Sequence, residues 1–143
     1  MMKEISLSNV SPVMKELKTQ DEESGAFVCE RENFIKIYQL AKCRRNSIWP
    51  ASYVLQLKLK AKDKDNKLLD LKKADDFLLK IIKNRIRRGD AVCHWDKSHF
   101  VTLLYNIEPS QVKIVYDRIK YFFYTNFDNP NKVKLSYNTH EVV

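Results

Sequence analysis

Apolar residues in the first third of the chain recur three or four positions apart, the spacing of one face of a helix. The first set surrounds Ser11-Pro12, a capping residue followed by a proline of the first turn, and comprises Val10, Val13, Met14 and Leu17. The second set comprises Phe34, Ile37, Tyr38 and Ala41. We therefore expect two amphipathic helices, one ending in the polar stretch 19–25 and one near Arg45. The short apolar segment 26–29 lies between them.

From Tyr53 the pattern changes to period two, which predicts a half-buried strand. One face of this strand carries Tyr53, Leu55, Leu57 and Leu59, and the other carries Val54, Gln56, Lys58 and Lys60. Segment 74–87 then shows a broad apolar stripe and stops before Gly89, as expected of a helix with a glycine just beyond its end.

Two short apolar runs, 91–95 and 100–105, flank the polar residues 96–99 and predict a β-hairpin. A strongly periodic helix is expected after Glu108-Pro109-Ser110, followed by a turn at 128–131 and a final alternating strand from Val133. From Tyr53 onward the predicted order is β-α-β-β-α-β. This is an α+β, ferredoxin-like antiparallel sheet with both helices on one face, preceded by extra N-terminal helices.

The composition fits one ordinary globular domain, because 44% of the 143 residues are hydrophobic and 31% are charged. A formal net charge of +8 favours anionic partners without naming one. Cys29, Cys43 and Cys93 have neither metal-site nor disulfide spacing, and no apolar run approaches the length of a membrane span. We expect a cytoplasmic protein with reduced thiols, no membrane partner and no cofactor.

Segment 79–105, LKIIKNRIRRGDAVCHWDKSHFVTLLY, resembles the centre of a GGDEF (diguanylate cyclase) domain, in which L-R-x-x-D, R-Y-G-G-D-E-F and an apolar strand ending in L-L follow a helix. The pattern aligns with residues 79–105 without an insertion or deletion. Asp90 takes the place of the Asp, Phe100 that of the closing Phe, and 103–104 that of the leucines. Arg31-Glu32-Asn33-Phe34 lies where that family has the start of a helix.

The N-terminal part is similar to a degenerate GGDEF-like domain at the C-terminus of bacterial transcriptional activators, which also carry a helical-repeat region and a DNA-binding head. Its pattern, G-A-F-x-C-x-x-x-x-F-x-x-I-Y-x-L, fits residues 25–40, and Arg44 follows. This resemblance implies a palm-like GGDEF fold over residues 25–143, with residues 1–24 as an N-terminal helix and linker. It further implies that the partners are the rest of such a regulator or a second copy.

The departures from the family pattern concern its chemistry. A diguanylate cyclase holds two divalent metals with an Asp on the first strand and an acidic residue in the hairpin. Here residues 55–58 are Leu-Gln-Leu-Lys, and the signature G-G-D-E-F is replaced by Asp96, Lys97, Ser98, His99 and Phe100. We therefore expect no cyclase activity, no catalytic residues and no metal site. The expected role is a non-catalytic regulatory, sensory or dimerisation domain of a transcriptional regulator.

One ligand-binding motif survives by position, since Arg87-Arg88-Gly89-Asp90 gives R-x-x-D where GGDEF domains place an inhibitory cyclic-di-GMP site. The resemblance implies that Arg87 and Asp90 bind a cyclic dinucleotide, as a guanidinium and a carboxylate can pair with phosphate and guanine. The structural alternative is that Asp90 caps the turn into the hairpin and Arg87 is a solvated cation at a helix end.

Two other functions remain open. RNA-recognition modules share the β-α-β-β-α-β order, and the net charge suits them, but only Phe100-Val101 fits their third-strand motif. A divergent cyclase-like enzyme would need Asp90 and Asp96 as new metal ligands. A metal site of Cys93, His94 and His99, or a Ser98-His99 nucleophile pair, is disfavoured because neighbouring strand residues point apart.

Overall fold

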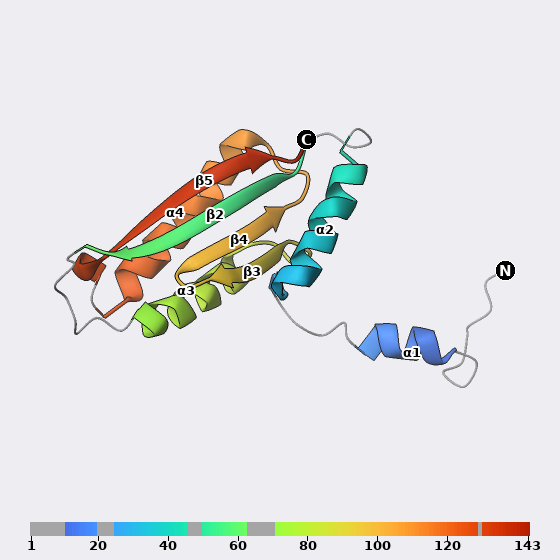
Figure 1. Cartoon of the computed structure of the whole chain (residues 1–143), viewed down its shortest axis with the longest axis horizontal. Helices are drawn as coiled ribbons and strands as arrows, with labels where there is room; N and C mark the ends of the chain where they lie inside the picture. Colours follow the sequence, from blue (N-terminus) through green and yellow to red (C-terminus); the bar gives the residue numbers. More distant parts are fainter. Residues whose placement is uncertain (1–10, 20–24, 46–49, 63–70, 129) are drawn as a thin grey trace.

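The computed structural model describes residues 11–19, 25–45, 50–62, 71–128 and 130–143, and its centre is a five-stranded sheet with helices on both faces (Figure 1). The strands are β1 (Phe27–Val28), β2 (Tyr53–Ala61), β3 (Ala91–Asp96), β4 (His99–Leu104) and β5 (Val133–Glu141). The helices are α1 (Pro12–Thr19), α2 (Arg31–Cys43), α3 (Leu71–Arg85) and α4 (Pro109–Asn126), with a 3-10 turn at Pro130–Lys132.

The predicted β-α-β-β-α-β order is confirmed from β2 to β5, and the fold is α+β. The prediction of a wholly antiparallel sheet was incomplete, because the strand order is β1-β3-β4-β2-β5 and β1 lies parallel to β3. The amide of Phe27 donates to the Asp90 carbonyl at 2.8 Å, and the amide of Cys29 donates to the Val92 carbonyl at 3.0 Å. Two residues are too few to show a period, so the apolar segment 26–29 could not be identified as a strand from the sequence.

The main core lies between the sheet and the helices α3 and α4, which share one face as predicted. Leu55, Leu57 and Leu59 of β2 point into this core and are at most 3% exposed. Phe100, the residue at the end of the signature, also lies here and has no exposed surface. Burial of such side chains contributes roughly 1.5–3 kcal/mol each, so this layer supplies most of the stability of the domain.

A second, smaller core lies on the opposite face, where α2 packs against β3 and β4. Phe34 and Ala41 of α2 meet Val101 and Leu103 of β4 there. The outer parts of β2 and β5 are not covered by this helix, and six consecutive residues at the end of β5, 136–141, are exposed. Helix α1 stands apart from the sheet in Figure 1, and its Val13 and Leu17 are 66% and 61% exposed. Among the described residues, no helix is long and apolar enough to cross a bilayer.

Candidate functional site

The turn of the β3–β4 hairpin is held by a buried carboxylate that sequence reasoning missed. Asp75 lies in α3, is 3% exposed, and accepts a hydrogen bond from the backbone amide of Ser98 at 2.8 Å. Ser98 has a left-handed backbone with φ of 56°. The only signal in the sequence was the position of Asp75, three and seven residues before Leu78 and Ile82, on the apolar stripe of the predicted helix.

Two buried oxygens at this turn, Oδ1 of Asp75 and Oγ of Ser98, have no hydrogen-bond partner in the described structure. The His94 ring lies close to them, with Nε2 at 3.5 Å from Oδ2 of Asp75 and its plane stacked on Phe100 at 4.4 Å between centres. A hollow of about 400 Å³ opens beside them and is lined by Lys72, Asp75, His94, Asp96 and Lys97. Carboxylates, an imidazole and ammonium groups therefore meet at the turn of the β3–β4 hairpin.

His99 lies on the other side of the hairpin from His94. Its Nε2 is 2.9 Å from Oε1 of Gln56 on the neighbouring strand, and it faces Lys58 directly across the β2–β4 pair. Burial lowers the pKa of His99, and the positive charges of Lys58 and then Arg31 lower it further, against the opposing effect of Asp96. This imidazole is therefore a neutral partner of Gln56 near neutral pH.

The side chains weighed as a metal site or a nucleophile pair do not converge. His94 faces α3 while His99 faces Gln56, and among the described residues no group of three or more His, Cys, Asp or Glu side chains could hold a metal ion. Cys29 and Cys93 lie in the smaller core, where burial raises the pKa of the Cys29 thiol to about 11. A thiol with so high a pKa stays protonated and unreactive.

Arg87 and Asp90 are brought together as a pair. Nε of Arg87 donates to Oδ2 of Asp90 at 3.0 Å and Nη2 donates to Oδ1 at 3.2 Å. The same carboxylate accepts from the backbone amides of Arg87 at 3.3 Å and Tyr105 at 3.1 Å, and the guanidinium also donates to the Tyr105 carbonyl. Asp90 thus closes the turn into β3, as the structural alternative predicted.

The two members of this pair differ in their access to solvent. The Asp90 side chain is 4% exposed, whereas the Arg87 side chain is 53% exposed. Asp90 can therefore orient Arg87, but only the guanidinium has free surface with which to meet a ligand.

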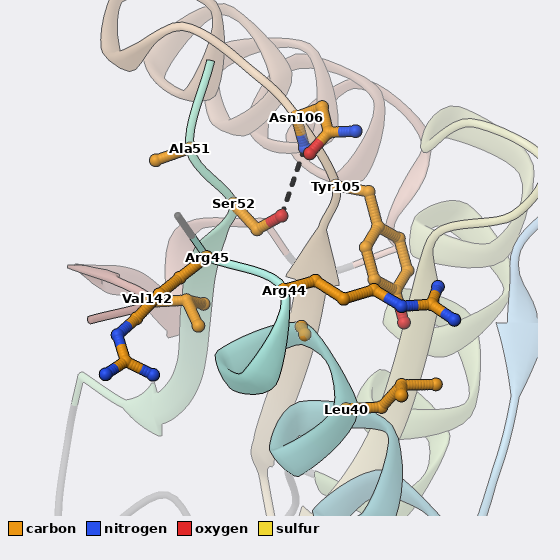
Figure 2. Close-up of a pocket in the computed structure, with 9 residues that line it drawn as sticks. Leu40, Arg44, Arg45, Ala51, Ser52, Tyr105, Asn106 and Val142 are labelled. Atoms are coloured by element: carbon orange, nitrogen blue, oxygen red, sulfur yellow. Dashed lines mark hydrogen bonds between the residues drawn. The ribbon is translucent and has the colours of Figure 1, made fainter. Parts of the chain in front are cut away.

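Two further hollows flank α2. The smaller, of about 160 Å³, lies between the end of α2, the start of β2 and the ends of β4 and β5. Figure 2 shows the Ser52–Asn106 hydrogen bond at its edge, in which the Asn106 amide donates to the Ser52 hydroxyl at 3.1 Å. The larger, of about 540 Å³, is a groove between α2 and the uncovered part of the sheet. Its lining consists of Phe34, Ile35, Tyr38, Val54, Gln56, Trp95, His99, Val101 and His140.

No family model matches this chain, and no curated protein does. Solved structures do match it. The GGDEF domain of PA1120 (YfiN or TpbB) from Pseudomonas aeruginosa superposes with a TM-score of 0.61 at 18% identity, over 78% of this chain and 74% of that one. A diguanylate cyclase (DGC) protein from Thermotoga maritima gives a TM-score of 0.60 at 16% identity, over 81% of each chain.

The coiled coil and GGDEF domain of DgcB from Caulobacter crescentus, solved in complex with c-di-GMP, gives a TM-score of 0.58 at 11% identity, over 90% of this chain and 75% of that one. At these identities the likeness concerns the fold. The chain has the fold of GGDEF domains, as its resemblance in sequence predicted.

Proposed function

We propose that this chain, which has the GGDEF fold, is a non-catalytic regulatory domain of a bacterial transcriptional regulator and has no diguanylate cyclase activity. Its role in this proposal is to bind a ligand or a second protein surface and pass that state to the rest of the regulator. The fold alone does not decide between catalysis and regulation, because one fold carries many functions. The side chains at the hairpin and on β2 carry the proposal.

The observation that carries it is the pair formed by Lys58 and His99. These residues lie directly opposite each other on β2 and β4. A cyclase places its metal-binding carboxylates on the first strand, which β2 matches, and in the hairpin that β4 belongs to. The neighbouring outward residue, Gln56, is hydrogen-bonded to His99. Mg²⁺ is bound mainly by carboxylate and phosphate oxygens, and an ammonium group at the same place repels it. This arrangement supports the loss of the two-metal chemistry.

An enzyme that uses Asp90 and Asp96 as new metal ligands is less well supported. Both oxygens of Asp90 already accept hydrogen bonds from Arg87 and Tyr105, and its side chain is 4% exposed. A metal ion would have to replace the hydrogen bonds of a buried carboxylate to reach it, which is costly.

The ligand we propose is a cyclic dinucleotide that contacts Arg87. DgcB is solved with c-di-GMP, and the diguanylate cyclase SiaD from Pseudomonas aeruginosa is solved with its activator SiaC, so proteins of this fold meet both kinds of partner. In this chain the Arg87 guanidinium is half-exposed. Asp90 and the Tyr105 carbonyl engage its Nε and Nη2, so Nη1 is the nitrogen that can donate to a phosphate.

The proposed absence of cyclase activity is tested by incubating the protein with GTP and either Mg²⁺ or Mn²⁺, with an active diguanylate cyclase as positive control. We expect no cyclic-di-GMP above the protein-free blank, and sustained production would overturn the proposal.

Ligand binding is tested separately by calorimetry with cyclic-di-GMP on wild type, Arg87→Ala and the neighbouring control Arg88→Ala. We expect at least tenfold weaker binding for R87A alone, since a charged hydrogen bond contributes about 1.5–3 kcal/mol. Equal binding by all three proteins would contradict the assignment of Arg87.

A further inference from the structure

The register of β2 and β5 gathers polar side chains on the half of the sheet that α2 leaves uncovered. Residues directly opposite each other in the pair share a face, and the pairs are Val54 with His140, Gln56 with Asn138, Lys58 with Ser136, and Lys60 with Lys134. Except for the buried Val54 and the half-buried Gln56, these side chains are exposed. We call Gln56, Lys58, Lys60, Lys134, Ser136, Asn138 and His140 the open sheet face.

The open sheet face is cationic. It carries three lysines and a histidine, and none of its strand residues is a carboxylate. Burial is the main cause of the lowered pKa of the adjoining His99, and the charges of Lys58 and Arg31 lower it further, against the effect of Asp96. A sheet surface with ammonium groups at alternate positions of one strand complements a chain of regularly spaced negative charges.

An aromatic groove of about 540 Å³ adjoins this face, on the side of α2. Trp95, Tyr38 and Phe34 line it, and Trp95 and Tyr38 are half-buried, so each has ring surface open to the groove. The Arg31 guanidinium lies 4.4 Å from the centre of the Trp95 ring. The volume of the groove lies within the roughly 300–1,000 Å³ of small-molecule sites, so the groove can admit one unstacked planar ring.

We propose that the open sheet face and the aromatic groove together bind single-stranded nucleic acid. Phosphates lie on Lys58, Lys60 and Lys134, while a base enters the groove against Trp95 or Tyr38. The amides of Gln56 and Asn138 lie between these two regions, where they can meet base edges. Stacking on aromatic rings beside a cationic track is the usual mode of single-strand binding by sheet surfaces.

The structure also explains why the sequence motif of RNA-recognition modules is absent. Phe100, the residue that would have been the stacking platform, is fully buried on the α3 and α4 side. The aromatic surface comes instead from Trp95, next to the β-bulge in the hairpin, and from α2. A duplex is disfavoured because its major groove is read by a protruding helix or ribbon, which the open sheet face lacks.

The test compares two triple variants of the full chain with equal net charge. K58Q/K60Q/K134Q removes the lysines of the open sheet face, and K80Q/K113Q/K120Q removes exposed lysines from α3 and α4 on the opposite side. Binding of a fluorescein-labelled 12-nucleotide oligo(U) is followed by anisotropy at several salt concentrations. We expect at least tenfold weaker binding for the first variant and less than a twofold change for the second. The logarithmic salt slope of the first should fall by about two, given roughly 0.7 per phosphate contact.

A second measurement follows Trp95 itself in a Trp49→Phe background, where base stacking should quench its fluorescence. Absence of oligo(U) binding at low salt, equal losses in the two triple variants, or an unquenched Trp95 at saturation would each overturn the proposal. Equally tight, face-dependent binding of a poly-glutamate peptide would also overturn it, in favour of an acidic polypeptide partner. None of these outcomes depends on the cyclase assay or on cyclic-di-GMP binding at Arg87.

Discussion

At the scale of single residues, Asp90 shows how a position that the sequence presents as a ligand contact also serves the fold. Its carboxylate accepts hydrogen bonds from two backbone amides and from the Arg87 side chain while being almost fully buried. Asp90→Asn replaces one accepting oxygen with a donor that faces another donor. We expect it to lower the free energy of unfolding by about 1–3 kcal/mol in urea titrations.

The matched control for D90N is Asp76→Asn, which changes an exposed carboxylate of α3 in the same way. It should shift the free energy of unfolding by no more than about 0.5 kcal/mol. Equal shifts in the two variants would show that loss of charge, and not the hydrogen bonds of Asp90, determines the result.

Ser98 combines two unfavourable features, a φ of 56° and a buried hydroxyl without a partner in the described structure. Glycine adopts this backbone freely, and relief of about 1–2 kcal/mol is partly offset by the entropy that glycine loses on folding, about 0.5–1 kcal/mol. Ser98→Gly should therefore stabilise the domain by roughly 1 kcal/mol. Its thermal midpoint is to be compared with that of Asn106→Gly.

Asn106 is a suitable control for Ser98→Gly because its φ is also positive, at 45°, but its side chain is exposed. Asparagine tolerates the left-handed region, so N106G should change stability by less than about 0.5 kcal/mol. A destabilised S98G protein would mean that the hydroxyl has a favourable contact after all.

The lowered pKa of His99 predicts a pH dependence of stability with a definite sign. The unfolded chain takes up this proton near pH 6.5, whereas the folded chain takes it up only at lower pH, because burial, Lys58 and Arg31 disfavour the charge. The unfolded state therefore binds more protons between these two values. The stability present above pH 6.5 is lost as the pH falls through the folded pKa.

This pH dependence is measured by urea unfolding between pH 8 and pH 5, alongside an NMR titration of the His99 ring. His99→Gln should remove its share of the decrease. Lys58→Gln should raise the pKa of His99 towards its ordinary value by removing the positive charge that lowers it most. A wild-type His99 that titrates at or above pH 6.5 would refute the assignment.

At the scale of elements, the attachment of β1 depends on Gly25. Its φ is +88°, and a Cβ atom there would lie 2.4 Å from the backbone carbonyl oxygen of Lys83. The same carbonyl accepts the amide of Ala26 at 2.9 Å. Gly25→Ala should therefore displace β1, lower the free energy of unfolding by about 2–4 kcal/mol, and speed hydrogen exchange at the amides of Phe27 and Cys29.

Gly89→Ala separates steric conflict from backbone conformation. Its φ is similar, at +98°, but no atom lies within 4 Å of the added Cβ. We expect a loss of about 1–2 kcal/mol from the left-handed conformation alone, with β1 exchange unchanged. If G89A were as damaging as G25A, the close approach to Lys83 would not be the cause.

The local elements were predictable because their periods are long enough to read. The alternation in β2 extends over the whole strand, and the apolar stripes of α3 and α4 each extend over several helical turns. The polar residues 96–99 marked the position of the hairpin turn. Only the first half of β5 shows the alternating pattern that predicted a strand. It continues to Glu141 because Thr139 and His140 pair with Leu55 and Val54, more than 80 residues away.

The candidate site was less predictable than the fold, because its contacts are non-local. Asp75 holds Ser98 across 23 residues, and nothing near either residue in the sequence indicates this contact. The cationic face likewise depends on the pairing of Lys60 with Lys134. In contrast, Arg87 and Asp90 are only three residues apart, and the sequence offered a turn cap by Asp90 as one of two alternatives. That alternative made Arg87 a solvated cation, so the ion pair between the two side chains was not predicted.

At the scale of the whole molecule, the predicted division into residues 1–24 and a domain over 25–143 can be tested by truncation, and the exposure of α1 predicts the result. Val13, Met14 and Leu17 of α1 are 66%, 44% and 61% exposed, so they contribute little apolar burial to the sheet or its helices. Both cores consist of residues from Ala26 onward. Stability follows buried area, so a chain of residues 25–143 should unfold within about 0.5 kcal/mol of the full chain.

The truncated chain is best followed by two probes in urea, because the two cores share one sheet. The first probe is the fluorescence of Trp95 in the Trp49→Phe background, because Trp95 packs edge-on against Phe34 and reports the α2 layer. The second probe is circular dichroism, which reports all helices and strands. Strands β2 to β4 contribute to both cores, so the two layers should unfold together and the two curves should coincide. A loss above about 1 kcal/mol on truncation would show that the apolar face of α1 packs on the domain. An earlier Trp95 transition would instead make the α2 layer a separate, weaker unit of the fold.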